Sequence, residues 1–319
     1  MTSTPDSRQR SWLIRNRMTL LTVACLLAYA AFVQWGWGWN TIIKQWADIG
    51  PGPGLAALAL LTSTYFVRCY RIYDYFPRET SGRFLQLFRL TQVHNLLNIM
   101  LPLRAGETSF PILMRSEFSV HLARATSALL VMRLLDLHAL LAAAGIGLVI
   151  ERDNTAVAWL VWGLFLVSPL AFFALKRPVL AIARKHAPKK IGGIVHELEA
   201  GMPFGYGAFT RAWLMTLLNW GTKVLVLAWA LALMGVSPLG AAFGGALGGE
   251  LSSVLPFHAP GGVGTYPAGI TAGALAFGAP ADRQALSSLA QASINAHLLI
   301  VASAITGTLL SLLLARKGR

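Results

Sequence analysis

Two ionisable residues lie close together in an otherwise apolar stretch of the sequence, Arg104 and Glu107. An ionised side chain at membrane depth is costly unless it pairs with an opposite charge or faces water. A guanidinium group binds phosphate through a planar fork of N–H donors, so Arg104 is a candidate ligand for an anionic group. Glu107 would then orient Arg104 or exchange a proton. The alternative is a structural ion pair that fixes a loop.

Four more charged residues within apolar segments extend this candidate site. Arg133 and Asp136 are three residues apart, so on a helix they share one face and can pair. Such a pair would either bind a ligand or only fix helix packing. Lys223 belongs to a partly polar stretch, which favours a position facing a cavity. Glu250 stands at the centre of a glycine-rich segment, and we count both residues among the candidate substrate-binding residues.

A glycine cluster follows Glu250 and offers a second kind of anion site. Gly261, Gly262 and Gly264 predict a tight turn whose backbone amides would cradle an anion beside a helix start. A turn without a ligand is the simpler interpretation. His258, just before this turn, is the counterpart of Arg104 in a repeat described below, so it joins the candidate substrate-binding residues.

The sequence lacks the motifs that common enzyme classes need. The histidines and the two cysteines, Cys25 and Cys69, have no metal-ligand spacing and no CxxC pair, so we expect neither a metal nor a cofactor. There is no GxxxxGK[ST] phosphate loop, no GxSxG motif and no catalytic carboxylate pair outside the apolar segments. We therefore expect a protein that is not an enzyme.

Membrane helices must position these residues. Of 319 residues, 55% are apolar and 13% charged, and the mean hydropathy is +0.57, so lipid is the expected solvent. We expect an all-α integral membrane protein with one transmembrane domain, residues 18–314, between short tails at 1–17 and 315–319. The complete spans that we expect are 18–39, 52–70, 126–150, 156–175, 212–234 and 286–314.

The basic residues predict the orientation of these spans. The net charge is +14, yet the connections on one side contain few of the basic residues: Lys44, Arg152 and Arg283. The connections on the other side, to which we assign Arg68 and Arg71, contain many more of them. This asymmetry predicts that both termini are cytoplasmic in a bacterial-type inner membrane. It accounts for the positive charge without a nucleic-acid partner.

Two segments, 84–123 and 239–279, are interrupted by prolines and do not fit as simple spans. We expect each to be a broken, re-entrant hairpin, the first entering from the cytoplasm and the second from outside. Their tips, 101–111 and 255–267, share an LP-apolar-basic-Ala frame, which predicts an inverted-topology repeat with substrate bound near the midplane. Alternatively the hairpins cross completely, giving eight or more spans.

The sequences NIMLPLRAGE at 98–107, RLLD at 133–136 and PGGVGTY at 260–266 resemble the flippase-like transmembrane domain of lysylphosphatidylglycerol synthases. The resemblance covers residues 15–314 and identifies a standalone member without the synthase domain. One departure is Pro267, where relatives often have a glutamate, so this chain has no carboxylate at that position. The positions that match the family pattern are Pro102, Arg104, Gly106, Glu107, Arg133, Asp136, Pro256, Gly261, Gly262 and Gly264.

The resemblance implies lipid translocation without synthase activity. We expect a flippase or scramblase that moves a phospholipid, or a polyprenyl-phosphate or glycolipid relative, through a midplane cavity. Arg104, with Lys223 as a second ligand, would hold the phosphate, while Glu107, Asp136 and Glu250 pair or titrate. The alternatives are a membrane-embedded enzyme and an accessory subunit that act on lipid-linked phosphates. A homo-oligomer or a lipid-synthesis partner is compatible with each of these.

Overall fold

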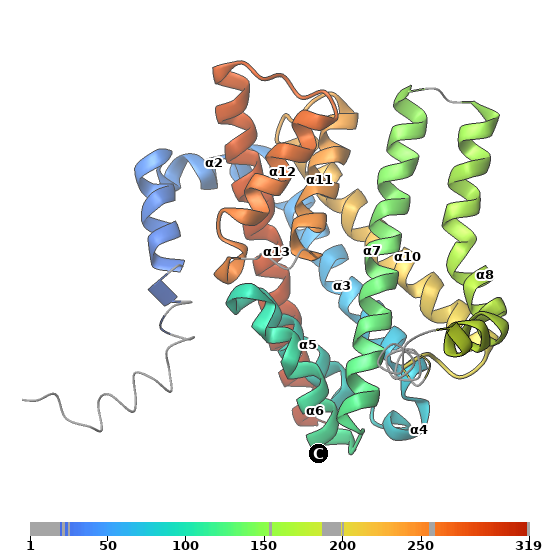
Figure 1. The fold of residues 1–319 in the computed structure, drawn as a ribbon. Coiled ribbons are helices and arrows are strands. Elements are labelled where there is room, and N and C mark those ends of the chain that lie inside the picture. Colours follow the sequence, from blue (N-terminus) through green and yellow to red (C-terminus); the bar gives the residue numbers. More distant parts are fainter. Residues whose placement is uncertain are drawn as a thin grey trace, which may run out of the picture.

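The computed structural model describes residues 20, 23–24, 26–152, 155–186, 199, 201–254 and 259–317. All regular structure in these residues is helical, and they contain no strand. This confirms the all-α expectation. The helices form a bundle with a short apolar helix, Leu26–Gly36, beside it (Figure 1).

The chain passes through the following elements. They are α2 (Trp39–Ile49), α3 (Pro51–Tyr75), α4 (Pro77–Thr80), α5 (Phe84–Met100), the 3₁₀ turn η1 (Pro102–Thr108), α6 (Ser109–Phe118), α7 (Leu122–Arg152), α8 (Ala156–His186), α10 (Tyr206–Leu233), α11 (Leu239–Val254), the 3₁₀ turn η2 (Pro260–Gly262), α12 (Thr265–Ala276) and α13 (Arg283–Lys317).

Four of the described helices are long and apolar enough to cross a membrane. They are Leu122–Ile150, Ala156–Lys176, Tyr206–Leu233 and Arg283–Ala315. They correspond to the predicted spans 126–150, 156–175, 212–234 and 286–314. The predicted span 52–70 lies in α3, which continues to Tyr75 through Arg68, Arg71 and Asp74 and is not among the four. The predicted span 18–39 lies partly outside the described residues.

The two proline-interrupted segments both fold as helical hairpins. In the first, α5 and α6 are joined by η1, and in the second, α11 and α12 flank η2. The first hairpin lies toward the end of the bundle where the chain terminates, and the second lies toward the opposite end (Figure 1). The turns η1 and η2 contact each other inside the bundle, and α7 packs against both α6 and α11.

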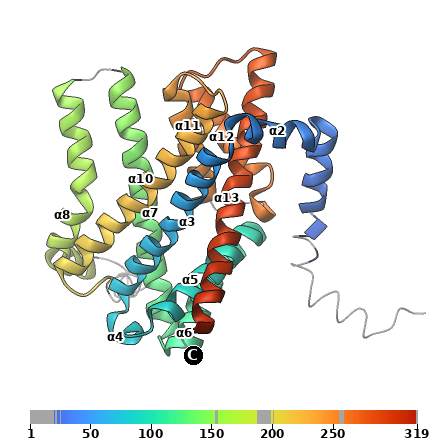
Figure 2. The ribbon, with the colours of Figure 1, turned by 180° about the vertical axis from the view of Figure 1, so that it is seen from behind.

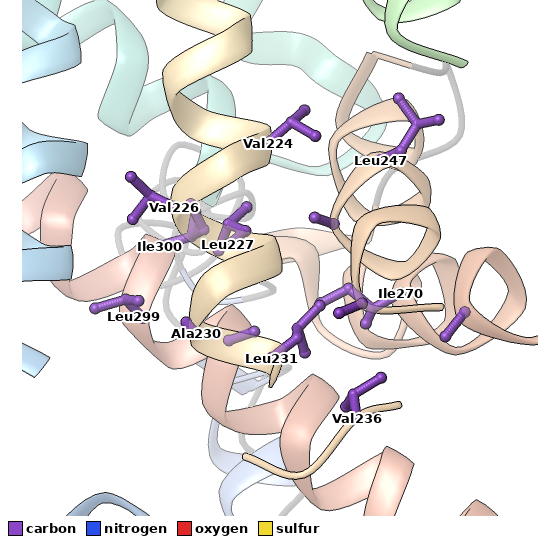
Figure 3. Packing of buried hydrophobic residues seen from close by; sticks show 14 of the residues in the cluster. Val224, Val226, Leu227, Ala230, Leu231, Val236, Leu247, Ile270, Leu299 and Ile300 are labelled. Carbon is purple, nitrogen blue, oxygen red and sulfur yellow. The ribbon is translucent and has the colours of Figure 1, made fainter. Parts of the chain in front are cut away.

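Each hairpin packs into its own apolar cluster. Leu231 of α10, Leu247 of α11 and Ile270 of α12 meet in the cluster of the second hairpin (Figure 3). Phe88 of α5 and Phe110 of α6 belong to the cluster of the first hairpin. Helix α3 runs beside α10 and α13 and contributes to both clusters, so it connects the two halves of the bundle (Figure 2).

Glycines allow the backbones of the second hairpin to touch. A Cβ atom on Gly248 would lie 2.2 Å from the carbonyl oxygen of Gly269, and one on Gly273 would lie 2.1 Å from that of Gly244. These distances are far below van der Waals contact, so no side chain fits between α11 and α12. The first hairpin has one similar approach, because a Cβ atom on Gly106 would lie 2.4 Å from Asn98 Cα.

Gly248→Ala should therefore separate α11 from α12 and destabilise the protein. Overpacking typically costs about 1–3 kcal/mol, which would lower the melting temperature by roughly 5 °C in a protein of this size. The matched control is Gly163→Ala, because nothing lies within 4 Å of a Cβ atom at that helical position. Scanning fluorimetry of both purified variants tests this packing, and equal melting temperatures would contradict it.

Candidate functional site

Asp136 is fully buried and is the centre of a polar network among α3, α7 and α10. Its Oδ1 accepts from Arg71 Nη1 at 2.5 Å and from Trp220 Nε1 at 2.8 Å. Its Oδ2 accepts from Arg133 Nη1 at 3.0 Å, as the three-residue spacing on α7 predicts. One buried carboxylate thus forms ion pairs with two arginines from different helices.

The network continues from α7 to the turn of the first hairpin. Arg133 Nη2 lies 2.8 Å from Glu107 Oε1, and the same oxygen accepts from Arg104 Nη2. The predicted Arg104–Glu107 pair is therefore formed. Arg104 also donates through Nη1 to the carbonyl oxygen of Val254, the last residue of α11. Arg104 consequently ties the turn of the first hairpin to the end of a helix in the second.

A second ion pair joins α10 to the second hairpin. Lys223 Nζ lies 3.0 Å from Glu250, and Tyr266 donates its hydroxyl to Glu250 Oε1 at 3.1 Å. Glu250 is only 1% exposed. The Lys223 ammonium lies over the Trp220 ring, 4.8 Å from its centroid. Because Trp220 also donates to Asp136, the indole connects the two parts of the network.

One further arginine, Arg68 on α3, belongs to the same site. Its Nη1 donates to Asn95 Oδ1 of α5 at 2.6 Å. Its charge interacts with those of Arg71, Arg133, Asp136 and Lys223. We call these eight ionisable residues the charged cluster. They are Arg68, Arg71, Arg104, Glu107, Arg133, Asp136, Lys223 and Glu250.

The assignment of Arg68 and Arg71 to a cytoplasmic connection was wrong. Both side chains lie along α3, and Arg71 is only 3% exposed and paired with Asp136. A window of apolar residues ends near position 70, whereas the helix continues to Tyr75. A buried carboxylate of another helix can offset the charge of a basic residue within a membrane helix. The hydropathy of one segment contains no information about such a partner.

The glycine turn is formed, but one of its backbone amides hydrogen-bonds within the turn. The Gly262 amide donates to the Ala259 carbonyl oxygen at 2.9 Å, so it is not available to cradle an anion. Gly261 accepts from His297 Nε2 at 2.8 Å, and Gly264 is the residue before α12. The predicted anion site therefore loses one of its donors. His258 and Pro256 lie outside the described residues, because the structure leaves out 255–258 at the start of the tip 255–267.

A small cavity adjoins the charged cluster within the described part of the chain. A cavity of about 20 Å³ is bounded by Arg68, Arg71, Arg133 and His94, together with apolar side chains of α3, α6 and α7. This is room for one water molecule. The described residues include no group of three or more His, Cys, Asp or Glu arranged for a metal. This cavity is too small for a lipid head group in this conformation.

Apolar helices long enough to cross a bilayer surround a buried ionic network, which defines a multi-pass α-helical membrane protein. Residues 19–303 match the family model described as "Lysylphosphatidylglycerol synthase TM region", and the chain belongs to this family. No curated protein and no solved structure matches the chain. The family membership agrees with the resemblance of the sequence and indicates a membrane protein that acts on lipids.

Proposed function

We propose that the protein moves a phosphate-bearing, anionic lipid across the membrane. The head group of a phospholipid, or of a polyprenyl-phosphate or glycolipid relative, passes through the charged cluster while the acyl chains stay in lipid. The protein carries out no chemical conversion in this proposal. The observation that carries it is an excess of positive charge in the cluster.

Five cationic side chains and three carboxylates make up the charged cluster, which leaves two positive charges in excess. A buried charge without a counter-ion is costly, because the surrounding medium has a low dielectric constant. A phosphodiester head group brings about one negative charge, a phosphomonoester brings up to about two, and both accept several hydrogen bonds. A phosphate-bearing head group would thus offset one or both of the excess charges.

The arrangement of the hairpins supports movement across the bilayer. They enter the bundle from opposite ends, and their turns meet beside the charged cluster (Figure 1). In the proposal they are re-entrant hairpins of an inverted repeat, and each one closes the cluster from one side of the membrane. Alternate opening of the two sides would carry the head group from one leaflet to the other.

The basic end of the bundle indicates how it is oriented. This end contains α4 and the last turns of α13 (Figure 2). Arg78 and Arg83 lie on or next to α4, and Arg89 and Arg124 pair with Glu117 and Glu79. In the proposal this end faces the cytoplasm at the inner membrane, in agreement with the positive-inside rule.

A vesicle assay tests the proposal. Purified protein is reconstituted with fluorescently labelled phosphatidylglycerol or with an uncharged labelled glycolipid that has no phosphate, and dithionite reports the label in the outer leaflet. We expect the protein to speed the crossing of phosphatidylglycerol roughly ten-fold or more over protein-free vesicles, with little effect on the glycolipid.

Two outcomes would contradict this expectation. Equal crossing of phosphatidylglycerol with and without protein would overturn the translocation proposal. Mass spectrometry of the lipids before and after incubation tests whether the protein is an enzyme instead. A lipid that is chemically changed by the purified protein alone would indicate an enzyme. Arg115→Ala is the control variant, since Arg115 is exposed at the end of α6 and outside the charged cluster.

A further inference from the structure

Arg68 differs from the other four cations of the charged cluster. Each of the others lies within ion-pair distance of a carboxylate, whereas Arg68 has no such partner among the described residues. Its neighbour Asp136 is already occupied, because its two oxygens accept from Arg71, Trp220 and Arg133. Arg68 therefore contributes a positive charge that no carboxylate of the described residues pairs directly.

The partner of Arg68 on α5 leaves a hydrogen-bond donor unused. A guanidinium group has only donors, so Asn95 must present its carbonyl oxygen to Arg68. The Asn95 Nδ2 group is buried and interacts with the Tyr65 hydroxyl of α3, but it forms no hydrogen bond of good geometry within the described protein. Buried polar groups in native proteins are nearly always hydrogen-bonded, so this amide can still donate to a water molecule or to a ligand.

Gln92, one helical turn before Asn95 on α5, shows the same deficit more strongly. Its side chain is 0% exposed, and neither its Nε2 nor its Oε1 has a hydrogen-bond partner in the described protein. It faces Tyr65 of α3 and Gly307 of α13, because a Cβ atom on Gly307 would contact both side chains. Donors on two successive turns of α5 thus lack a full set of partners, and the second of them, Asn95, contacts Arg68 of α3.

We infer that Arg68, Asn95 and Gln92 form the binding site for the phosphate of the translocated head group. This inference rests on the proposed function and names the residues that bind the substrate. Arg68 provides charge and a planar fork of donors, and the two amides add neutral N–H donors, which together suit phosphate oxygens. The cavity beside Arg68, about 20 Å³, is too small for a whole phosphate, so in this proposal the site opens before the head group enters.

A binding experiment tests this site independently of transport. Purified protein is titrated with a soluble short-chain phosphatidylglycerol, and separately with inorganic phosphate, and tryptophan fluorescence reports binding. Arg68→Gln should weaken binding of the lipid roughly ten-fold, as expected for loss of a charge-assisted contact. Arg124→Gln is the matched control, because Arg124 is paired with Glu79 at the basic end of the bundle.

Gln92→Leu separates binding from structure. If the Gln92 amide binds the ligand, this variant should lose about five-fold in affinity while its melting temperature stays the same or rises, since an unsatisfied buried amide is removed. Unchanged lipid affinity in both Arg68→Gln and Gln92→Leu would overturn the site. Inorganic phosphate that binds as tightly as the lipid would overturn the lipid assignment. Binding that depends on Arg68 without transport in vesicles would refute the proposed function but support the site.

Discussion

Asp136→Ala should unfold at a markedly lower temperature than the parent protein. The carboxylate accepts hydrogen bonds from Arg71, Arg133 and Trp220, and it is the only carboxylate within ion-pair distance of Arg71 among the described residues. Breaking a buried ion pair by removing one partner typically costs about 3–5 kcal/mol, because the other charge stays buried. Scanning fluorimetry in detergent should show a decrease of roughly 10 °C in melting temperature.

Glu117→Ala is the matched control for this effect. Glu117 pairs with Arg89 at 2.8 Å, but each of the two side chains is 25% exposed. Water can replace the lost partner there, so the expected cost is about 0–1 kcal/mol. If Asp136→Ala melts at the same temperature as Glu117→Ala, another anion must pair with Arg71 or water must solvate it. Asp136 would then not be the essential partner of Arg71 in the charged cluster.

The local parts of the charged cluster could be predicted from the sequence. Arg104 and Glu107 are three residues apart, and so are Arg133 and Asp136, so helical geometry alone brings each pair together. The positions of the two hairpins were predictable as well. Prolines interrupt both segments, and proline removes a backbone donor that a continuous helix needs.

The long-range contacts could not be predicted in the same way. Arg71 and Asp136 are 65 positions apart, and Trp220 and Asp136 are 84 apart. No periodicity within one segment specifies which helices become neighbours. Trp220 and Tyr266 were missed because an aromatic residue in an apolar helix usually only packs, and nothing local shows that its polar atom meets a buried carboxylate. Lys223 and Glu250 were selected as deep charges, but their pairing became evident only from the packing of α10 on α11.

Arg104 makes contacts that its residue type alone does not predict. The sequence predicts a phosphate ligand, yet in this conformation Arg104 donates to Glu107 and to the Val254 carbonyl oxygen, which joins the two hairpins. Its φ of 55° lies in the left-handed region, which a residue other than glycine adopts only when surrounding contacts stabilise it. Arg104 therefore positions the turn of the first hairpin against the second.

Arg104→Ala should reduce lipid translocation in vesicles roughly ten-fold or more, because the contact with Val254 of the second hairpin and the ion pair with Glu107 are both lost. Arg104→Lys should restore only part of the rate, since a single ammonium group cannot direct a planar fork toward two acceptors. Arg104→Gly separates side chain from backbone: glycine relieves the left-handed conformation, so this variant should be more stable than Arg104→Ala but equally slow. If either Arg104→Ala or Arg104→Gly moves labelled phosphatidylglycerol at the rate of the Arg115→Ala control, the connection between the hairpins is not required for translocation.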